Sequence, residues 1–161
     1  MPPFVIEPLS NHDRANFSCG VESLDAYFRK QVTQDMRRRV TSCFVAVDDE
    51  GKRLAGYYTL SAGGVVLTDL PEAQKKRLPL YPLVPVARLG RLVVDKNYQG
   101  QKLGAALLWD AFERASHVEL LAFALIVDAK DAKAKAFYER FGFFSFGSTP
   151  PQLMLPLKKG Q

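Results

Sequence analysis

The chain has 161 residues, of which 47% are apolar, and it carries a formal net charge of +5 at pH 7. That length predicts one domain over 1–161, which buries roughly 70% of its unfolded surface and needs no cross-links. Its two cysteines, Cys19 and Cys43, exclude a disulfide framework and a cysteine-based zinc site, and favour a reducing cytoplasm. No apolar stretch approaches the ~20 residues of a membrane span, and the N-terminus lacks a signal-peptide pattern. The modest positive charge permits a nucleic-acid partner without requiring one.

The N-terminal half predicts a strand over 4–8, a helical segment and then a hairpin. Apolar residues recur at spacings of three and four after the first strand, which indicates one face of a helix or of a helix pair. Two runs rich in β-forming residues then flank a turn at 48–52, and the second run continues past a bend at Gly63 and Gly64. The helical face consists of Phe17, Val21, Leu24, Phe28 and Val32, and the hairpin strands cover 41–47 and 54–62 with an extension over 65–68.

The C-terminal half alternates helices and strands. A short helix begins at Pro71, and prolines 79, 82 and 85 mark an ordered loop before the next strand. The continuous apolar run of 120–127 indicates a strand buried on both faces. A final helix ends at Gly142, which suits a C-terminal cap. The order of elements predicts an α/β fold with a mixed sheet. The elements of this half are a helix over 71–77, a strand over 86–94, a helix with Leu103, Leu107, Ala111, Phe112 and Ala115 on one face, a strand over 120–127, a helix over 131–141 and short strands over 143–146 and 153–157.

The segment 88–104 reads as a strand, a glycine-bearing turn and the start of a helix. A diphosphate is held by several backbone N–H groups that point in one direction, and a helix N-terminus adds its dipole. The sequence Gln99-Gly-Gln-Lys-Leu-Gly104 meets this need if Lys102 is helical and offers its N–H like any other residue. Such turns are more often purely structural, so this one is weak evidence on its own.

Together with the segment 127–143, this turn resembles the GNAT superfamily of N-acetyltransferases, whose pattern is Gln/Arg-x-x-Gly-x-Gly/Ala. Gln99 matches the first position and Gly104 the last, while Lys102 stands where glycine is usual and adds charge attraction for a phosphate. The resemblance implies a mixed, mostly antiparallel sheet flanked by about four helices, with a splayed central strand pair. It implies acetyl-CoA as co-substrate, no metal, and cofactor contacts from Leu92, Val93, Val94, Gln99, Gly100, Gln101, Lys102, Leu103, Gly104, Ala105, Asp131 and Phe137.

Tyr138 is the candidate general acid. Acetyl transfer to an amine expels CoA as a thiolate, and a phenol with pKa near ~10 is close enough to a thiol near ~8.5 to share a proton. The family commonly has Asn-x-x-Ala-x-x-x-Tyr here, and Asp131, which replaces the asparagine, has helix capping as an alternative role. For the helix alone, an aromatic that packs on the sheet explains Tyr138 equally well. His12 and His117 lie outside both motifs and read as surface histidines, and an α-amine with pKa ~8 needs no dedicated base.

Four stretches, at 17–28, 34–40, 56–62 and 89–95, look like the acetyltransferase toxins of bacterial type II toxin–antitoxin systems. The resemblance covers nearly the whole chain. It implies acetylation of the α-amino group on aminoacyl-tRNA, which blocks translation. It also implies a small ribbon-helix-helix antitoxin that contacts DNA in complex with the toxin, and commonly a homodimer.

The basic residues suit a tRNA backbone, which such proteins hold through phosphate contacts without base reading. A solvated helix end and ordinary salt bridges are the alternative interpretations. The candidate contacts are Lys30, Arg37, Arg38, Arg88 and Arg91, and a second basic strip comprises Lys130, Lys133 and Lys135.

Two other classes stay open: a GNAT enzyme that acts on a small amine or a peptide N-terminus, and a binding module that keeps only the fold. The early helices and the loop over 79–85 are the expected acceptor pocket. Tyr57, Tyr58 and Phe146 are the aromatics expected at a dimer interface.

Overall fold

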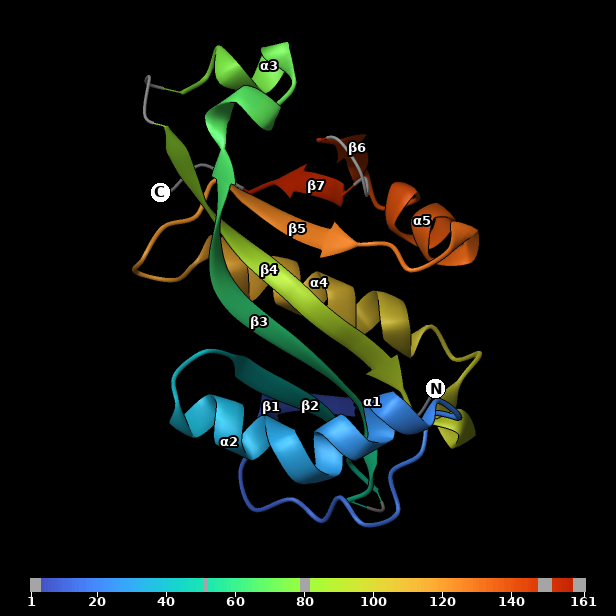
Figure 1. Cartoon of the computed structure of the whole chain (residues 1–161). Helices are drawn as coiled ribbons and strands as arrows, with labels where there is room; N and C mark the ends of the chain where they lie inside the picture. The colour runs from blue at the N-terminus through green and yellow to red at the C-terminus, as the bar shows by residue number, and fades with distance from the viewer. Residues whose placement is uncertain (1–3, 51, 79–81, 148–151, 158–161) are drawn as a thin grey trace. The chain divides into compact units, whose positions relative to one another are not determined.

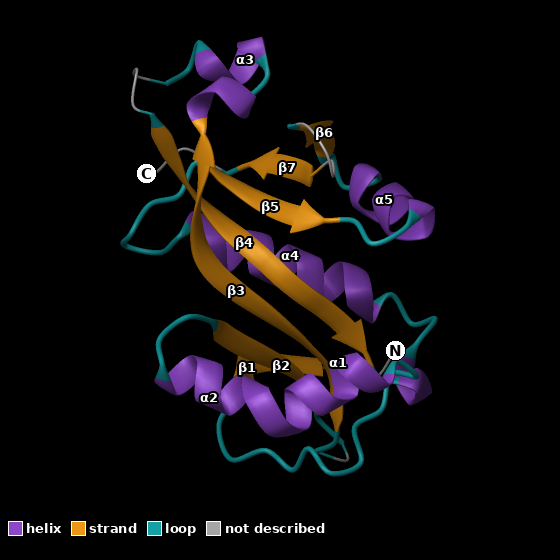
Figure 2. Ribbon diagram, viewed as in Figure 1, coloured by secondary structure: helices purple, strands orange, loops and turns teal. Residues whose placement is uncertain are grey.

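The computed structural model describes residues 4–50, 52–78, 82–147 and 152–157 (Figure 1). Helices and strands follow one another in the predicted order, with short 3-10 and π segments between them (Figure 2). In the described chain, no helix is both long and apolar enough to cross a bilayer. The elements are β1 (Phe4–Pro8), α1 (Glu22–Ala26), the π-helix η1 (Tyr27–Gln31), α2 (Val32–Arg37), β2 (Ser42–Asp48), β3 (Leu54–Val66), η2 (Leu67–Asp69), α3 (Glu72–Lys75), β4 (Leu83–Val94), η3 (Lys96–Tyr98), α4 (Leu103–Ser116), β5 (Ala124–Asp128), α5 (Ala132–Glu139), β6 (Phe144–Phe146) and β7 (Gln152–Pro156).

The described strands form a mixed sheet of seven, in the order β1-β2-β3-β4-β5-β7-β6. The pairs β1–β2, β2–β3, β5–β7 and β6–β7 are antiparallel. By contrast, β4 and β5 are parallel, which requires a crossover, and α4 supplies it. Their register covers Ala87 opposite Leu125 and Arg88 opposite Ile126, although β4 continues to Val94. The α/β class with a mixed, mostly antiparallel sheet is therefore confirmed.

The chain divides into two compact units, one from the described residues of 1–61 and 89–111, the other from those of 62–88 and 112–161. Strands β3 and β4 and helix α4 each contribute residues to both units. Each unit is built around its own cluster of buried apolar side chains.

The first unit is organised around three aromatic rings. Phe28 and Tyr57 stack face to face, with centroids 4.2 Å apart and planes at 2°, and Phe17 packs edge-on against both. The Tyr57 hydroxyl donates to the Leu24 carbonyl at 2.9 Å, so this buried phenol is satisfied. The predicted helical face is wrong at its start, because α1 begins at Glu22 and Val21 is its exposed N-cap. Phe17 precedes the helix and is buried in the apolar cluster of this unit.

A π-helix at Tyr27–Gln31 joins α1 to α2, a feature that the spacing of apolar residues did not predict (Figure 1). The wider turn bonds Val32 N–H to the Tyr27 carbonyl, five residues back. The Phe28 carbonyl accepts a hydrogen bond from the Arg14 guanidinium at 2.8 Å. The π-helix therefore shifts the register of everything that follows it in α2 relative to α1.

The second unit has a core of apolar residues from β3, β4, β5, β6 and β7. Four residues of β5, from Ala124 to Val127, are buried, as expected of a strand covered on both faces. The strand begins later than predicted, however, and Leu120 and Leu121 precede it with 89% and 69% of their surface exposed. The predicted extension of the strand past Gly63 and Gly64 is confirmed as far as Val66, where β3 ends.

Two smaller expectations differ in detail. Pro71 is the N-cap of α3 and not its first helical residue. The β4 strand begins at Leu83, before the predicted Val86, and the first part of the proline loop, 79–81, lies outside the described residues.

A close approach in the first unit depends on Gly56 of β3. A Cβ atom there would lie 2.8 Å from the Val93 carbonyl oxygen of β4 and 3.0 Å from the Leu107 side chain of α4. Backbone cannot yield as a flexible side chain can, so the strand pair and helix need glycine at this position.

We expect Gly56→Ala to lower the free energy of unfolding by about 1–3 kcal/mol, because the added methyl overpacks a site bounded by backbone. Urea denaturation measures this. Gly63→Ala is the matched control on the same strand, since its Cβ would meet only the Arg88 side chain at 3.5 Å. Equal losses from both substitutions would contradict the explanation.

Candidate active site

The end of β4 is fixed by Asp95, a buried carboxylate in the first unit. Its Oδ2 accepts from the Ser18 N–H at 3.0 Å, and its Oδ1 accepts from the Asn97 N–H at 2.8 Å. Its own N–H donates to the Ala55 carbonyl at 2.8 Å. Asp95 therefore ties β4 to β3, to the loop before α1 and to the first turn of η3.

Gln99, predicted to bind the cofactor, uses its side chain to support the turn. The amide nitrogen Nε2 donates to the Val94 carbonyl at 3.1 Å and to the Cys19 carbonyl at 3.3 Å. These contacts explain in structural terms why a glutamine occupies the first position of the motif.

The turn itself runs through two residues with positive φ, Gly100 at +84° and Lys102 at +63°. The expectation that Lys102 is helical is therefore wrong, because its backbone is left-handed. Glycine takes such a conformation freely, whereas a residue with a Cβ pays a steric penalty. Lys102 thus keeps the turn geometry of the residue it replaces.

The α4 N-terminus immediately follows this turn. The Ala106 N–H donates to the Lys102 carbonyl at 3.2 Å, so the N–H groups of Leu103, Gly104 and Ala105 precede the first N–H donor of the helix. No side chain of the described residues accepts from them, whereas Asp131 caps α5. Three uncapped N–H groups and the helix dipole form a donor set that fits a diphosphate.

Two further side chains belong to this turn: the Lys102 ammonium is a donor, and the Gln101 side-chain oxygen is an acceptor. Lys102 is exposed and, among the described residues, makes no ion pair. The Gln101 Oε1 atom is buried and lacks a hydrogen-bond donor in the described chain. An orphaned buried acceptor is uncommon in a folded protein and points to a ligand or water at this turn.

Tyr138 belongs to the second unit and lies on α5. Its half-buried ring packs against Phe137 and Phe143, with centroids 5.2 Å and 5.4 Å away. Burial raises the pKa of its hydroxyl to about 12, so the phenol is protonated throughout the neutral range. Among the described residues, no group hydrogen-bonds to this hydroxyl. Tyr138 therefore presents an uncommitted O–H donor.

Asp131 is the N-cap of α5, the alternative role that the sequence left open. Its Oδ1 accepts from the Ala134 N–H at 2.8 Å. Phe137 is half-buried and contacts Phe141 at 5.1 Å between centroids. At the other end, α5 stops earlier than predicted, at Glu139 with Arg140 as its C-cap, and Gly142 with φ +97° lies in the turn that follows.

The predicted basic residues fall into two groups. Arg88 faces Asp128 at 3.8 Å, and Arg91 lies over the Tyr27 ring with its Cζ atom 3.4 Å from the centroid. Both therefore have contacts inside their own unit. Lys30, Arg37 and Arg38 are exposed and make no ion pair among the described residues. Lys130, Lys133 and Lys135 are likewise exposed.

Several side chains differ from expectation. Tyr57 and Tyr58 are fully buried and Phe146 nearly so, which removes them as exposed dimer aromatics. His12 is half-buried and bonds to Glu7 at 2.6 Å, whereas His117 is exposed. The described residues contain no cluster of three or more histidine, cysteine or acidic side chains suited to a metal.

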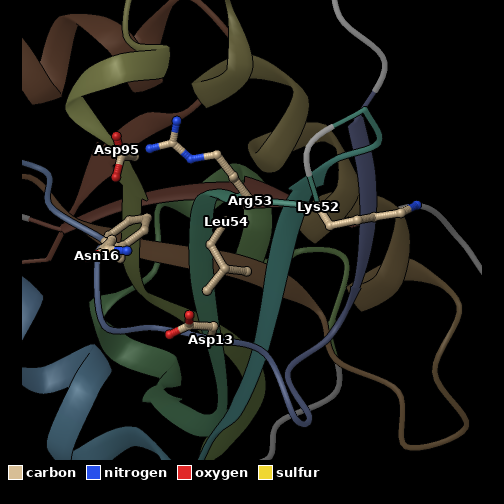
Figure 3. Close-up of a pocket in the computed structure, with 7 residues that line it drawn as sticks. Asp13, Asn16, Lys52, Arg53, Leu54 and Asp95 are labelled. Atoms are coloured by element: carbon tan, nitrogen blue, oxygen red, sulfur yellow. The ribbon is translucent and has the colours of Figure 1, made fainter.

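The first unit also contains a polar pocket of about 210 Å³ beside the end of β4 (Figure 3). In the close-up, Arg53 extends toward Asp95, and Lys52 points away from it. Mixed charges and carboxylates in backbone hydrogen bonds make this pocket a poor diphosphate site. Its lining residues are Asp13, Asn16, Phe17, Lys52, Arg53, Leu54 and Asp95.

The mixed seven-stranded sheet of the described strands, with its crossover helix α4, has the fold of the GNAT class of acetyltransferases. A family model for the acetyltransferase (GNAT) family matches residues 7–143, and the chain belongs to that family.

The chain is similar over almost its full length to bacterial toxins of this family. A tRNA-acetylating toxin of Mycobacterium tuberculosis is 37% identical over 150 residues, covering 91% of this chain and 87% of that protein. A probable toxin TacT of Sinorhizobium fredii is 27% identical over 164 residues, covering 95% and 91%. The structure of AtaT with acetyl-methionyl-tRNA has a TM-score of 0.87 at 27% identity, covering 96% of this chain and 95% of that one. Related AtaT and KacT structures contain acetyl-CoA, the antitoxin AtaR or DNA.

We expect Lys102→Gly to raise the free energy of unfolding by ~1 kcal/mol, because glycine relieves the left-handed strain. The measurement is denaturant unfolding without ligand. Lys96→Gly is the control, since Lys96 is also an exposed lysine, its φ is not positive, and the added unfolded-state entropy should lower stability. A loss of stability in Lys102→Gly would contradict the strain argument.

Proposed function

We propose that this chain is the toxin of a type II toxin–antitoxin system, and that it acetylates the α-amino group of aminoacyl-tRNA with acetyl-CoA. The observation that carries the proposal is the similarity, over 91% of the chain, to a tRNA-acetylating toxin. The agreement in fold with AtaT bound to acetyl-methionyl-tRNA supports the same substrate class.

The α4 turn is the proposed cofactor cradle. The uncapped N–H groups of Leu103, Gly104 and Ala105 would hold the diphosphate of acetyl-CoA, with Gly100, Gln101 and Lys102 completing the turn. The backbone of β4 over 92–94 would hold the pantetheine arm, and Asp95 and Gln99 fix that strand end. We assign Phe137 and Asp131 to the same cofactor: Phe137 would contact it with its ring, and Asp131 fixes the start of α5 as its N-cap. Acetyl-CoA supplies a thioester whose carbonyl carbon accepts an amine.

Tyr138 is the proposed acid. Attack of the amine nitrogen on the acetyl carbon would form the C–N bond and break the C–S bond, and the sulfur would leave with that electron pair. The Tyr138 O–H would donate its proton to the sulfur, the amine would lose its proton to solvent, and solvent would return a proton to the phenol. Burial raises the pKa of Tyr138 to about 12, above the ~8.5 of a thiol, so the phenol would act as a hydrogen-bond donor to the leaving sulfur for most of the step.

The exposed cations of α2 and its neighbourhood are the proposed tRNA contacts. Lys30, Arg37 and Arg38 have no carboxylate partner in the described chain, so they are available to phosphates. Arg88 and Arg91 are assigned to the acceptor side of the same substrate.

The remaining assignments concern partners and location. By analogy with the AtaT–AtaR and KacTA–DNA complexes, we propose a cognate ribbon-helix-helix antitoxin that brings the toxin to DNA. A homodimer and a cytoplasmic location complete the proposal.

We expect the wild-type protein to transfer label from acetyl-CoA to the amino acid of charged tRNA. Tyr138→Phe should slow this transfer by about 10²-fold or more while acetyl-CoA still binds, because only the proton donor is removed. Transfer to a pool of charged tRNAs measures the first effect and calorimetry the second.

Tyr98→Phe is the matched control, since its hydroxyl donates to Asp48 at 2.9 Å and has no role in transfer. If free amines or peptide N-termini were labelled and no charged tRNA was, the proposed substrate would be wrong, and the chain would still be an acetyltransferase.

The pH dependence follows from the raised pKa of Tyr138. We expect the rate to rise as the substrate α-amine deprotonates near pH ~8, and to show no loss up to pH 10, because the phenol ionises only near about 12. A pH–rate profile for single turnovers measures this. A falling limb centred between pH 8 and 10 would mean that an acid other than Tyr138 donates the proton.

A further inference from the structure

Arg91 of β4 combines a tight aromatic contact with free hydrogen-bonding capacity. Its Cζ atom lies 3.4 Å from the centroid of Tyr27, so the guanidinium lies in contact with the ring. This cation–π contact uses none of the guanidinium N–H groups as hydrogen-bond donors to a side-chain or backbone oxygen. Among the described residues, neither a carboxylate nor a carbonyl accepts from Arg91. The residue is therefore held in place by one contact that does not consume its donors.

Tyr27 is itself fixed. It is buried, it begins the π-helix, and its hydroxyl donates to Asp35 Oδ2 of α2 at 2.7 Å. Burial raises the pKa of this phenol to about 12, with the hydrogen bond to Asp35 contributing in the same direction. The hydroxyl thus remains a donor at neutral pH, and Asp35 is occupied by the phenol without forming an ion pair with Arg91.

Two other arginines of the first unit have structural roles. Arg14 donates to the Phe28 carbonyl at 2.8 Å, and Arg29 donates to the Phe17 carbonyl at 2.9 Å and to Glu22 at 3.4 Å. Both therefore bind a backbone carbonyl, and Arg29 also binds a carboxylate. Arg91 has no such acceptor among the described residues, and an arginine held by an aromatic contact with its N–H groups free is suited to a phosphate.

We propose that Arg91 binds a backbone phosphate of the tRNA substrate, with Tyr27 and Asp35 as positioning residues. The inference rests on the proposed function and adds a specific contact to it. RNA is favoured over the phosphates of acetyl-CoA because Tyr27 belongs to the helical run that presents Lys30 and Arg37, two further unpaired cations. The α4 turn, by contrast, already provides N–H donors for the cofactor.

The test uses the full chain with the Tyr138→Phe substitution, so that binding is measured without turnover. The probe is fluorescently labelled deacylated bacterial tRNA, titrated at several KCl concentrations. Arg91→Gln should weaken binding by about 10-fold to 100-fold, because hydrogen bonds to a charged group are lost. It should also reduce the slope of log K against log salt by about 0.7–0.9, the contribution of one phosphate contact.

Two further variants separate positioning from charge. Arg91→Lys should keep the salt slope and weaken binding about threefold to tenfold, because the stacked, planar fork is lost. Tyr27→Leu should have a similar effect, and its combination with Arg91→Lys should add little, since both remove one contact. If Tyr27→Leu does not fold, Asp35→Asn removes the charged anchor of the phenol and should weaken binding in the same direction.

Arg29→Lys is the matched control, and it should lower the Tm without changing the salt slope. A slope and affinity unchanged in Arg91→Gln would overturn the proposal. So would a loss of acetyl-CoA affinity with tRNA binding intact, because the phosphate would then belong to the cofactor. If the Tyr138→Phe protein bound acetyl-CoA but no tRNA, the proposed substrate itself would fall, and this assignment with it.

Discussion

The buried carboxylate of Asp95 is the constraint on which the proposed cofactor site depends. An unpaired charge in this position would be costly, and its two oxygens accept backbone N–H groups from Ser18 and Asn97. Through these bonds one side chain fixes the end of β4, the approach to α1 and the turn that leads into α4. Gln99 adds a second tie between the same segments. The backbone donors of the α4 turn thus start from a fixed strand end.

Much of the fold could be predicted from the sequence. The spacing of apolar residues predicts most helices and strands, because it reflects which side chains are buried, and the structure confirms that burial. The turn at Gln99–Gly104 and the helix with Tyr138 stand out only through their resemblance to the GNAT family, because a glycine turn or an aromatic on a helix has structural explanations when taken alone. By contrast, the start of β5 was misplaced, because an apolar run such as that at Leu120 does not reveal where pairing begins.

Other features had no signal in the sequence. A π-helix involves ordinary residues, and it is stabilised here by the distant Arg14. The left-handed backbone at Lys102 contradicts the preference of lysine, and only the turn around it explains the conformation. Whether an arginine has a structural role or is free to bind a ligand depends on hydrogen-bond acceptors that lie far from it in the sequence. Tyr27 and Asp35 were missed for the same reason, since their importance comes from a ring that lies under Arg91.

The π-helix has a consequence for how this family of chains can vary. An α-helix advances by about 100° per residue, and a π turn absorbs one extra residue, so each later residue lies about 100° behind the position that an uninterrupted α-helix of the same sequence would give it. A gene that lost one codon within Tyr27–Gln31 would close this segment to an α-helix, and the side chains of Arg37 and Arg38 would keep their azimuth. A codon lost within α2 has no such turn to absorb it and would rotate every later residue of the helix by about 100°. Two one-residue gaps at neighbouring positions of an alignment thus have opposite consequences, and only the gap inside the π turn preserves the direction in which the arginines point.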